Sequence, residues 1–429
     1  MGGAETLASL RGFKDLLPEE AFKWRQIESA AHAAFAAFGF HPIGTPLLEP
    51  AELFTRSIGA TSDIIEKEMY AFDDWDGRKV SLRPEGTVSV VRAYLTHHLS
   101  DSALRKFYYI GPMFRHERPQ AGRLRQFHQI GVEIIGDASP KRDVELLALL
   151  YDLMQRLGVN GLPLTINTLG CPECRPSYRM ALQFYLSGQS DLCVDCLRRS
   201  AVNPLRVLDC KKETCREAVR GAPSPIDDLC KACQCHFEAV RSTLSDLGLV
   251  YTLNPHLVRG LDYYTRTVFE LNSPALGAQN AVAAGGRYDA LVALLGGPQT
   301  PAIGFAIGVE RLAALVSFPQ QPDLPLFLVP LGENAARRLF PLLFALRRKN
   351  LACEIGEETA GLKAQLKRAD RLHATYAFIV GEAELNTGVA LLRNMRTGTQ
   401  QTVAIAQAAD ILPDVCTPVS SSSVIPPRL

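Results

Sequence analysis

Residues 106–136 hold the feature that most limits the possible folds, two apolar runs joined by a polar link. The runs KFYYIGPMFRH and RQFHQIGVEIIG are rich in aromatic and branched residues, and the link ERPQAGRL contains a proline and a glycine. This pattern is typical of an antiparallel β-hairpin with a long tip. Alternate residues of a strand share one face, which places His128, Ile130, Val132 and Ile134 on one side and Gln129, Gly131 and Glu133 on the other.

The second of these faces is polar. An amide, a glycine and a carboxylate in a row pack poorly in a core, but they suit a small polar ligand that carries an amine. Arg115, Glu117 and Arg118 leave the first run, and Arg123 and Arg125 enter the second. Guanidinium groups bind phosphate through two parallel hydrogen bonds. The hairpin therefore indicates a site for a polar ligand with phosphates, and the alternative is an exposed edge hairpin held by salt bridges.

The bulk properties are those of an ordinary globular protein. With 429 residues the chain is too long for one compact core, so two or three domains are expected. The net charge of +1 means that any nucleic-acid contact must rest on local basic patches. No apolar run approaches the roughly 18–20 residues of a membrane span, and the charged N-terminal segment does not resemble a signal peptide. We expect a cytoplasmic protein without membrane contact.

Nine of the eleven cysteines lie between Cys171 and Cys235. Most of them form close pairs, which are Cys171 with Cys174, Cys193 with Cys196, Cys210 with Cys215, and Cys230 with Cys233. Close thiols in an intracellular protein indicate metal binding or reduced cysteines, not a disulfide framework. Four pairs of this spacing can build one or two closed structural zinc sites. The alternative is a set of reduced thiols without metal.

The hairpin also carries a family resemblance. Phe114–Glu117, followed by Arg123 and by Gln126–Gln129, resembles motif 2 of class II aminoacyl-tRNA synthetases in the form found in histidyl-tRNA synthetases. The proline-interrupted strand over 40–50 resembles motif 1, with Pro46 as its proline, and implies a homodimer. From the residues alone it is an edge strand, because proline inside a strand is confined to edges.

Three further segments match the same family. LRPEGT, which contains Glu85, Gly86 and Thr87, resembles the segment that lines the amino-acid pocket. Glu85 and Thr87, an acid and a hydroxyl at the start of a helix, could also cap that helix, and capping alone would explain Thr87. LVRGLDYYTRTVFE at 257–270 resembles the histidine-specific motif, and AGGRYD at 284–289 a second family motif. PAIGFAIGVERL at 301–312 resembles motif 3, a buried strand feeding a helix.

The resemblance implies a domain order. We expect an α+β class II fold with an antiparallel-sheet catalytic core and a C-terminal α/β anticodon-binding domain. The expected division is a first part of the core over 1–169, a helical cysteine-rich insertion over 170–245 that grips the tRNA acceptor arm, a second part of the core over 246–320, the anticodon-binding domain over 324–413 and a flexible tail over 414–429.

The resemblance also implies a function, the activation of L-histidine with ATP and Mg2+ and its transfer to tRNA(His). Arg115 and Arg259 would hold the α-phosphate, and Arg311 with Mg2+ the outer phosphates. The implied ATP-binding residues are Arg115, Glu117, Arg123 and Arg311. The implied histidine-binding residues are Glu85, Gly86, Thr87, Gln129, Glu133, Arg259, Tyr263 and Tyr264, with the two tyrosines at the imidazole. One alternative is a related regulatory subunit of histidine biosynthesis, which binds histidine without charging tRNA. A second alternative is a zinc-stabilised RNA-binding protein that retains an inactive synthetase core.

Overall fold

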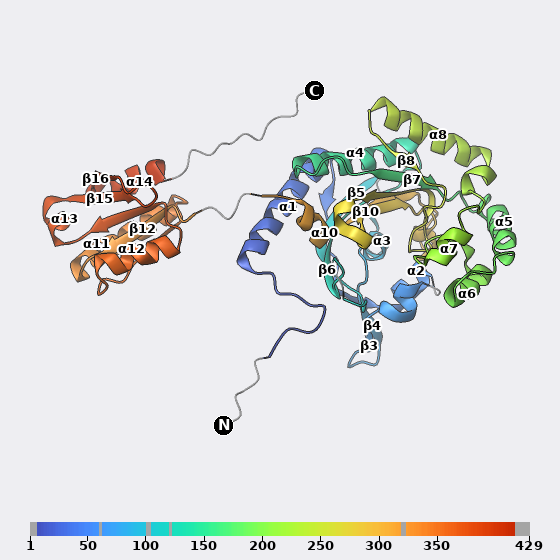
Figure 1. Ribbon diagram of the computed structural model, residues 1–429, viewed down its shortest axis with the longest axis horizontal. Coiled ribbons are helices and arrows are strands. Elements are labelled where there is room, and N and C mark those ends of the chain that lie inside the picture. The colour runs from blue at the N-terminus through green and yellow to red at the C-terminus, as the bar shows by residue number, and fades with distance from the viewer. Residues whose placement is uncertain (1–6, 60–61, 100–103, 120–121, 319–322, 417–429) are drawn as a thin grey trace. The chain divides into compact units, whose positions relative to one another are not determined.

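The computed structural model describes residues 7–59, 62–99, 104–119, 122–318 and 323–416. The chain divides into two compact units, residues 1–318 and residues 319–429 (Figure 1). We call them the core unit and the C-terminal unit. Within the described part of the chain, no helix combines the length and the apolar character that a membrane crossing needs. Residues 417–429 of the expected tail lie outside the described ranges.

The core unit is built on an eight-stranded sheet of order β1–β5–β6–β11–β10–β9–β7–β8. Its strands are β1 His41–Pro42, β5 Arg105–Phe114, β6 Gln126–Ile135, β7 Leu164–Thr168, β8 Thr252–Leu253, β9 Thr265–Asn272, β10 Ala281–Arg287 and β11 Ala302–Gly308. All neighbours are antiparallel except the outer pairs β1 with β5 and β7 with β8. β5 and β6 pair continuously from Arg105 opposite Ile135 to Phe114 opposite Gln126, which confirms the predicted hairpin.

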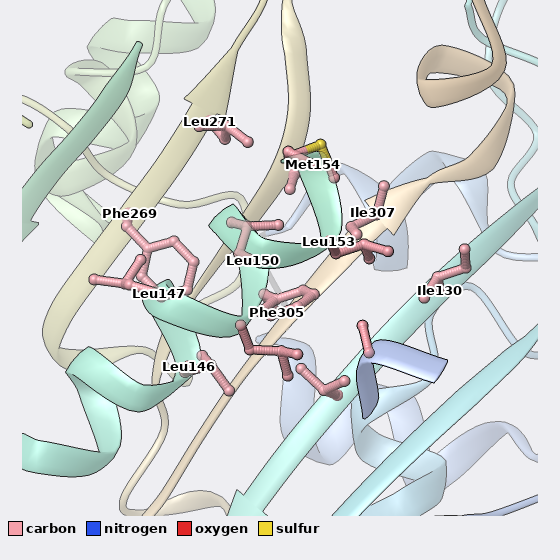
Figure 2. Close-up of a cluster of buried hydrophobic side chains, with 14 of the residues drawn as sticks. Ile130, Leu146, Leu147, Leu150, Leu153, Met154, Phe269, Leu271, Phe305 and Ile307 are labelled. Atoms are coloured by element: carbon pink, nitrogen blue, oxygen red, sulfur yellow. The ribbon is translucent and has the colours of Figure 1, made fainter. Parts of the chain in front are cut away.

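One face of this sheet carries the main hydrophobic core. Helix α4 (Pro140–Arg156) begins at Ser139, whose side chain accepts from the Lys141 N–H, and it packs on β6 and β11 together with α1 (Pro18–Ala37). Figure 2 shows the apolar stripe of α4 against the strands, with these labelled side chains: Ile130, Leu146, Leu147, Leu150, Leu153, Met154, Phe269, Leu271, Phe305 and Ile307. Ile130, Val132 and Ile134 are all in this core, so the predicted apolar face of β6 is confirmed.

The proline-interrupted segment 40–50 forms two short strands, not one. β1 pairs with β5 at the edge of the large sheet, whereas β2 (Leu48–Pro50) lies in a three-stranded sheet of order β2–β4–β3. Pro46, which lies between them, lacks the N–H that a continuous ladder requires. The small sheet is completed by β3 Ala71–Asp73 and β4 Lys79–Leu82, and its neighbouring helices are α2 Ala51–Ile58, the π-helix η1 Ile64–Glu68 and α3 Thr87–Thr96.

The segment between β7 and β8 is helical. Its elements are α5 Arg175–Ser187, α6 Val194–Val202, the 3-10 turn η3 Pro204–Val207, α7 Glu213–Ala218, the 3-10 turn η4 Pro225–Asp228 and α8 Lys231–Asp246. In Figure 1 they gather on one side of the core unit. The remaining helices of this unit are η5 Pro274–Gln279, α9 Leu291–Leu294 and α10 Val309–Leu315.

The C-terminal unit is a five-stranded sheet of order β13–β12–β14–β15–β16 with helices on both faces. Its strands are β12 Leu326–Pro330, β13 Cys353–Ile355, β14 Tyr376–Val380, β15 Val389–Asn394 and β16 Gln400–Ala404. Its helices are α11 Glu333–Arg348, α12 Leu362–Arg371, α13 Glu382–Thr387, η6 Ile405–Gln407 and α14 Ala408–Cys416. α11 and α14 share one hydrophobic cluster, and α12 contributes to the other.

Candidate functional site

A cavity lies on the polar face of the large sheet, where β6, β10 and β11 meet the loop before α3 and the loop before β9. Segments far apart in sequence deliver charged and aromatic side chains to it. The predicted site residues that line it are Glu85, Thr87, Arg115, Glu117, Arg123, Gln129, Arg259, Tyr263, Tyr264 and Arg311. Two predicted residues, Gly86 and Glu133, do not line the cavity and lie behind its wall.

Glu133 is a fully buried carboxylate behind the floor of the cavity. The hydroxyl of Thr87 donates to its Oε1 at 2.7 Å, and the hydroxyl of Tyr288 donates to its Oε2. Burial raises the pKa of Glu133 to about 8, although both hydrogen bonds act in the opposite direction. The carboxyl is therefore poised to change charge near neutral pH. Gly304 faces it from β11, where a side chain would overlap the carboxylate.

Glu85 holds the start of helix α3. Its carboxylate accepts from the backbone N–H of Thr87 at 3.0 Å and of Val88 at 2.8 Å. These are donors that a helix leaves without intrahelical partners. Of the two predicted capping residues, Glu85 therefore caps the helix, whereas the hydroxyl of Thr87 donates to Glu133. The hydroxyl of Tyr263 lies 3.4 Å from Glu85, and burial raises the pKa of the Glu85 carboxyl.

Gly86 belongs to the packing around Tyr109, a residue that the sequence analysis did not single out. The ring of Tyr109 lies where a side chain at Gly86 or at Gly131 would project. Both glycines therefore admit this ring beneath the cavity. Tyr109 is buried and its hydroxyl has no hydrogen-bond partner among the described residues. Burial raises its pKa well above the ordinary range.

Arg259 is fixed by an ion pair. Its Nη1 lies 2.9 Å from the Oε2 of Glu270, which comes from β9. The neighbouring tyrosines of the same loop pack on each other, with ring centroids 4.9 Å apart, and Tyr263 also meets Tyr288 edge-on at 5.8 Å. Burial raises the pKa of Tyr264 to about 12, so this hydroxyl remains a donor at neutral pH. The tyrosine rings thus form an aromatic wall with hydroxyl groups at its edge, and the guanidinium of Arg259 lies beside it.

The opposite end of the cavity is dominated by guanidinium groups. Arg115 donates through Nε to the carbonyl oxygen of Pro84 at 2.9 Å and lies over the ring of Phe127 at 5.3 Å. Arg123 pairs with Glu117 at 2.8 Å. Arg311 donates to the carbonyl oxygens of Gly122 at 3.2 Å and Ala281 at 2.8 Å. Burial lowers the pKa of Arg311, with the charge of Arg123 as a further cause. Such a cluster suits an anion with several phosphates.

Several contributors were not in the predicted set. Tyr288 and Glu310 line the cavity, and Glu270 holds Arg259. All three lie inside quoted motifs, Tyr288 in AGGRYD, Glu310 in PAIGFAIGVERL and Glu270 in LVRGLDYYTRTVFE, and this was the signal that could have identified them. The glycines of AGGRYD do not line the cavity. Gly285 and Gly286 sit in β10, where side chains would collide with the neighbouring strands β11 and β9.

The paired cysteines form two clusters. The basal thiol cluster consists of Cys171, Cys174, Cys230 and Cys233, and the distal thiol cluster of Cys193, Cys196, Cys210 and Cys215. In each cluster all four sulfur atoms lie within 4.8 Å of one another, and all eight thiols are free. In sequence order, the first predicted cysteine pair thus combines with the fourth, and the second combines with the third. Either cluster has the composition of a site that could hold one metal ion.

The chain is similar to known proteins along most of its length. The histidyl-tRNA synthetase family model matches residues 12–174 and 189–312, and the anticodon binding domain model matches residues 326–414. The histidine–tRNA ligase of Desulfosudis oleivorans is 50% identical over 412 residues, which cover 95% of this chain and 97% of that protein. That of Geobacter sulfurreducens is 50% identical over 404 residues, covering 93% and 97%. The crystal structure of apo S. aureus histidyl-tRNA synthetase gives a TM-score of 0.80 at 34% identity, covering 94% of this chain and 99% of that one.

Proposed function

The chain belongs to the histidyl-tRNA synthetase family, and from this premise we propose that its cavity binds histidine and ATP side by side and joins them. The observation that carries the proposal is the convergence on one cavity of the loops 83–87 and 257–264, the β5–β6 hairpin and the start of α10. Each of these segments supplies a charged or aromatic group.

The histidine half lies at the tyrosine wall. Tyr263 and Tyr264 hold the imidazole, since their buried hydroxyls can donate to and accept from its two nitrogens. Thr87 and Gln129 meet the amine and carboxyl region, with the Glu133 carboxylate supplying negative charge from behind. An amino acid without matching polar groups would leave these buried partners unpaired, which gives strong discrimination.

The ATP half lies at the guanidinium cluster. Arg115, stacked on Phe127, and Arg123 bind phosphates, with Glu117 holding Arg123 in place. Arg311 supports the outer phosphates and the adenine, a use that depends on a planar delocalised cation.

Magnesium enters with ATP. Carboxylates are hard oxygen ligands of the kind that Mg2+ prefers together with substrate phosphates, and those of Glu117 and Glu310 line the cavity. These residues would hold the ion, which neutralises phosphate charge. For the two thiol clusters we propose Zn2+, because four thiolates select a soft tetrahedral metal.

The chemistry is an in-line displacement. A carboxylate oxygen of histidine attacks the α-phosphorus, the bond to the diphosphate oxygen breaks, and histidyl-adenylate and diphosphate result. No protein nucleophile is required, because positioning and charge stabilisation suffice. Arg259, held by Glu270, and Arg115 stabilise the charge that builds on the α-phosphate oxygens. The histidyl group then passes to the terminal ribose of tRNA(His), and AMP leaves.

The domain roles follow from the family. We propose that the helical insertion, 170–245, contacts the tRNA acceptor arm, between core parts 1–169 and 246–320. We propose that 324–413 recognises the anticodon. Exposed Leu47 and Leu48, at the proline-bearing edge segment, support a homodimer. Sedimentation at micromolar concentration tests this assembly, and a monomer would contradict it. We propose a cytoplasmic location, because ATP and tRNA, the proposed substrates, are both present there.

The regulatory alternative has less support. The C-terminal unit matches the anticodon binding domain over residues 326–414, which a subunit that does not charge tRNA has no need to keep. Arg115, Arg259 and Arg311 are all present at the cavity. The proposal is tested by histidine-dependent exchange of labelled diphosphate into ATP, with the other amino acids as controls. Exchange with histidine alone is expected, and no exchange from folded protein would refute activation.

A further inference from the structure

The basal thiol cluster has the dimensions of an occupied tetrahedral metal site, and the four sulfurs of the distal thiol cluster also lie within 4.8 Å of one another. In the basal thiol cluster the sulfur of Cys171 lies 3.7 Å from that of Cys230, and the sulfur of Cys174 lies 3.8 Å from those of Cys171 and Cys233. Four sulfurs around Zn2+ at about 2.3 Å would stand about 3.8 Å apart. A disulfide would require about 2.05 Å. We propose that each cluster binds one Zn2+ and that the basal zinc, through Arg175, positions the histidine-binding loop 257–264.

The surroundings of both clusters favour thiolate ligands. The backbone N–H of Cys171 donates to the sulfur of Cys174 at 3.1 Å, and the N–H of Cys193 donates to the sulfur of Cys215 at 3.2 Å. Backbone donors aimed at ligand sulfurs stabilise the negative charge that metal binding requires. Gly170 has a φ of +69°, and a side chain there would approach the Cys174 sulfur to 2.6 Å. The chain is thus shaped closely around this sulfur.

The basal cluster joins the two ends of the helical insertion. Cys171 and Cys174 follow β7, and Cys230 and Cys233 stand at the start of α8, which leads back to the core. The partners Cys171 and Cys230 are 59 residues apart in sequence. One metal ion at this point would fix both ends of the insertion to the sheet, whereas the distal thiol cluster would act only within the insertion.

Arg175 connects the basal cluster to the histidine half of the cavity. It directly follows the ligand Cys174, and its Nη2 donates to the backbone carbonyl oxygen of Tyr264. Tyr264 lines the cavity, together with Arg259 from the same loop. Arg175 is therefore a positioning residue, because it holds the loop through a backbone atom and does not line the cavity itself.

A second connection runs through α8. His236, three residues after the ligand Cys233, lies 2.9 Å from the buried carboxylate of Asp143 through its Nε2. Asp143 also pairs with the fully buried Arg287, next to Tyr288. Both ends of the insertion thus contact groups that border the histidine-binding half of the proposed site, and the coupling of metal to histidine binding rests on that proposed function.

Metal analysis of the full-length protein, purified without chelator, tests the first half of the proposal. Two zinc ions per chain are expected. Cys233→Ser and Cys196→Ser should each lose one zinc, from the basal and the distal cluster respectively. Cys235→Ser is the matched control, because this exposed cysteine belongs to neither cluster, and it should keep both. Absence of zinc with all thiols titratable, or iron in place of zinc, would overturn the assignment.

Arg175→Ala tests the second half without touching a ligand. It should retain two zinc ions and raise the KM for histidine in diphosphate exchange about tenfold, the size expected for one lost charged hydrogen bond. The KM for ATP should change less than about twofold, and Arg175→Lys should restore part of the loss. Arg179→Ala, one turn along α5 and bonded to the carbonyl of Val202, is the control.

The outcomes separate the two proposals. If Arg175→Ala matches Arg179→Ala in its KM for histidine, the coupling is refuted whatever the metal content. If the wild-type protein shows no exchange, the proposed function fails, while the zinc count still decides the metal sites. In that case calorimetric titration with histidine replaces exchange, and unchanged affinity in Arg175→Ala would refute the coupling.

Discussion

Replacement of Tyr288 by phenylalanine isolates one hydrogen bond beneath the cavity. The hydroxyl donates to the buried Glu133, whose other side-chain donor is Thr87 at 2.7 Å. Phenylalanine retains the ring that meets Tyr263 edge-on, so the packing is kept and the donor is lost. Because the hydrogen bond stabilises the ionised carboxylate, its loss should raise the pKa of Glu133 further.

The size of the effect follows from the charge state. A hydrogen bond to a charged group contributes about 1.5–3 kcal/mol and a tenfold ratio is about 1.4 kcal/mol, so the pKa of Glu133 should rise from about 8 to about 9–10. The carboxyl is protonated below its pKa and ionised above it. At pH 7.5 its ionised fraction would fall from about a quarter to about 3% or less. If histidine requires the ionised form, apparent affinity falls about eight- to eightyfold.

The assay is the KM for histidine in diphosphate exchange between pH 7 and 8.5, where the histidine amine stays charged. In the wild-type protein, the KM should fall as the pH rises through 8, and in Tyr288→Phe it should still be falling at the upper limit. Tyr151→Phe, which removes a hydroxyl bonded to the carbonyl of Val250, is the control. A Tyr288→Phe profile that overlays the wild type would refute the argument that Glu133 charge governs histidine binding.

Three further predictions follow from single contacts. Arg259→Gln should slow diphosphate exchange about 100- to 1000-fold with little change in the KM for ATP, because it removes a donor to the developing charge beside Glu270; an unchanged rate would exclude Arg259 from the reaction. Gly304→Ala should lower the thermal midpoint of unfolding and abolish diphosphate exchange, because the added methyl would lie 2.6 Å from the carbonyl oxygen of Val132 and overlap Glu133. Gly44→Ala is the control and should do neither, because the space around Gly44 is open. Leu147→Ala, in the main core, should reduce the free energy of unfolding by about 2–5 kcal/mol in denaturant titration, and a loss below about 1 kcal/mol would contradict the packing in Figure 2.

Local pattern was enough to predict much of the fold. The β5–β6 hairpin follows from alternation, and its two faces are those the sequence indicates. In the C-terminal unit, the apolar runs of the sequence predict strands over 326–330, 376–380 and 389–394, and β12, β14 and β15 have these bounds. The elements α13 and β16 were missed because they are short and largely exposed, with no apolar period. α14 was missed as well, and it continues past Pro413 to Cys416, where the predicted domain had ended.

The contacts between residues within the site could not be predicted from the sequence. Sequence similarity predicted residue types at the cavity, and the sequence offered both Glu85 and Thr87 as caps of α3. Only the structure shows that Glu85 is the cap and that Thr87 donates to Glu133. Gly86 and Gly131 are distant in sequence, and only folding shows that both make room for Tyr109. Cysteine spacing indicated metal ligands, but spacing alone does not say which pairs combine. The first pair meets the fourth because the helices between them bring the two ends of the insertion together.

The most direct test of the central claim is transfer of labelled histidine to a tRNA(His) transcript by the full-length protein. We predict ATP-dependent attachment of histidine, none of the other amino acids at comparable concentration, and loss of attachment in Arg259→Gln. Histidine activation without transfer to tRNA would contradict the proposed charging of tRNA(His), whereas histidine binding without activation would support the regulatory alternative. Neither activation nor transfer from folded protein would contradict the proposal that this cavity joins histidine to ATP.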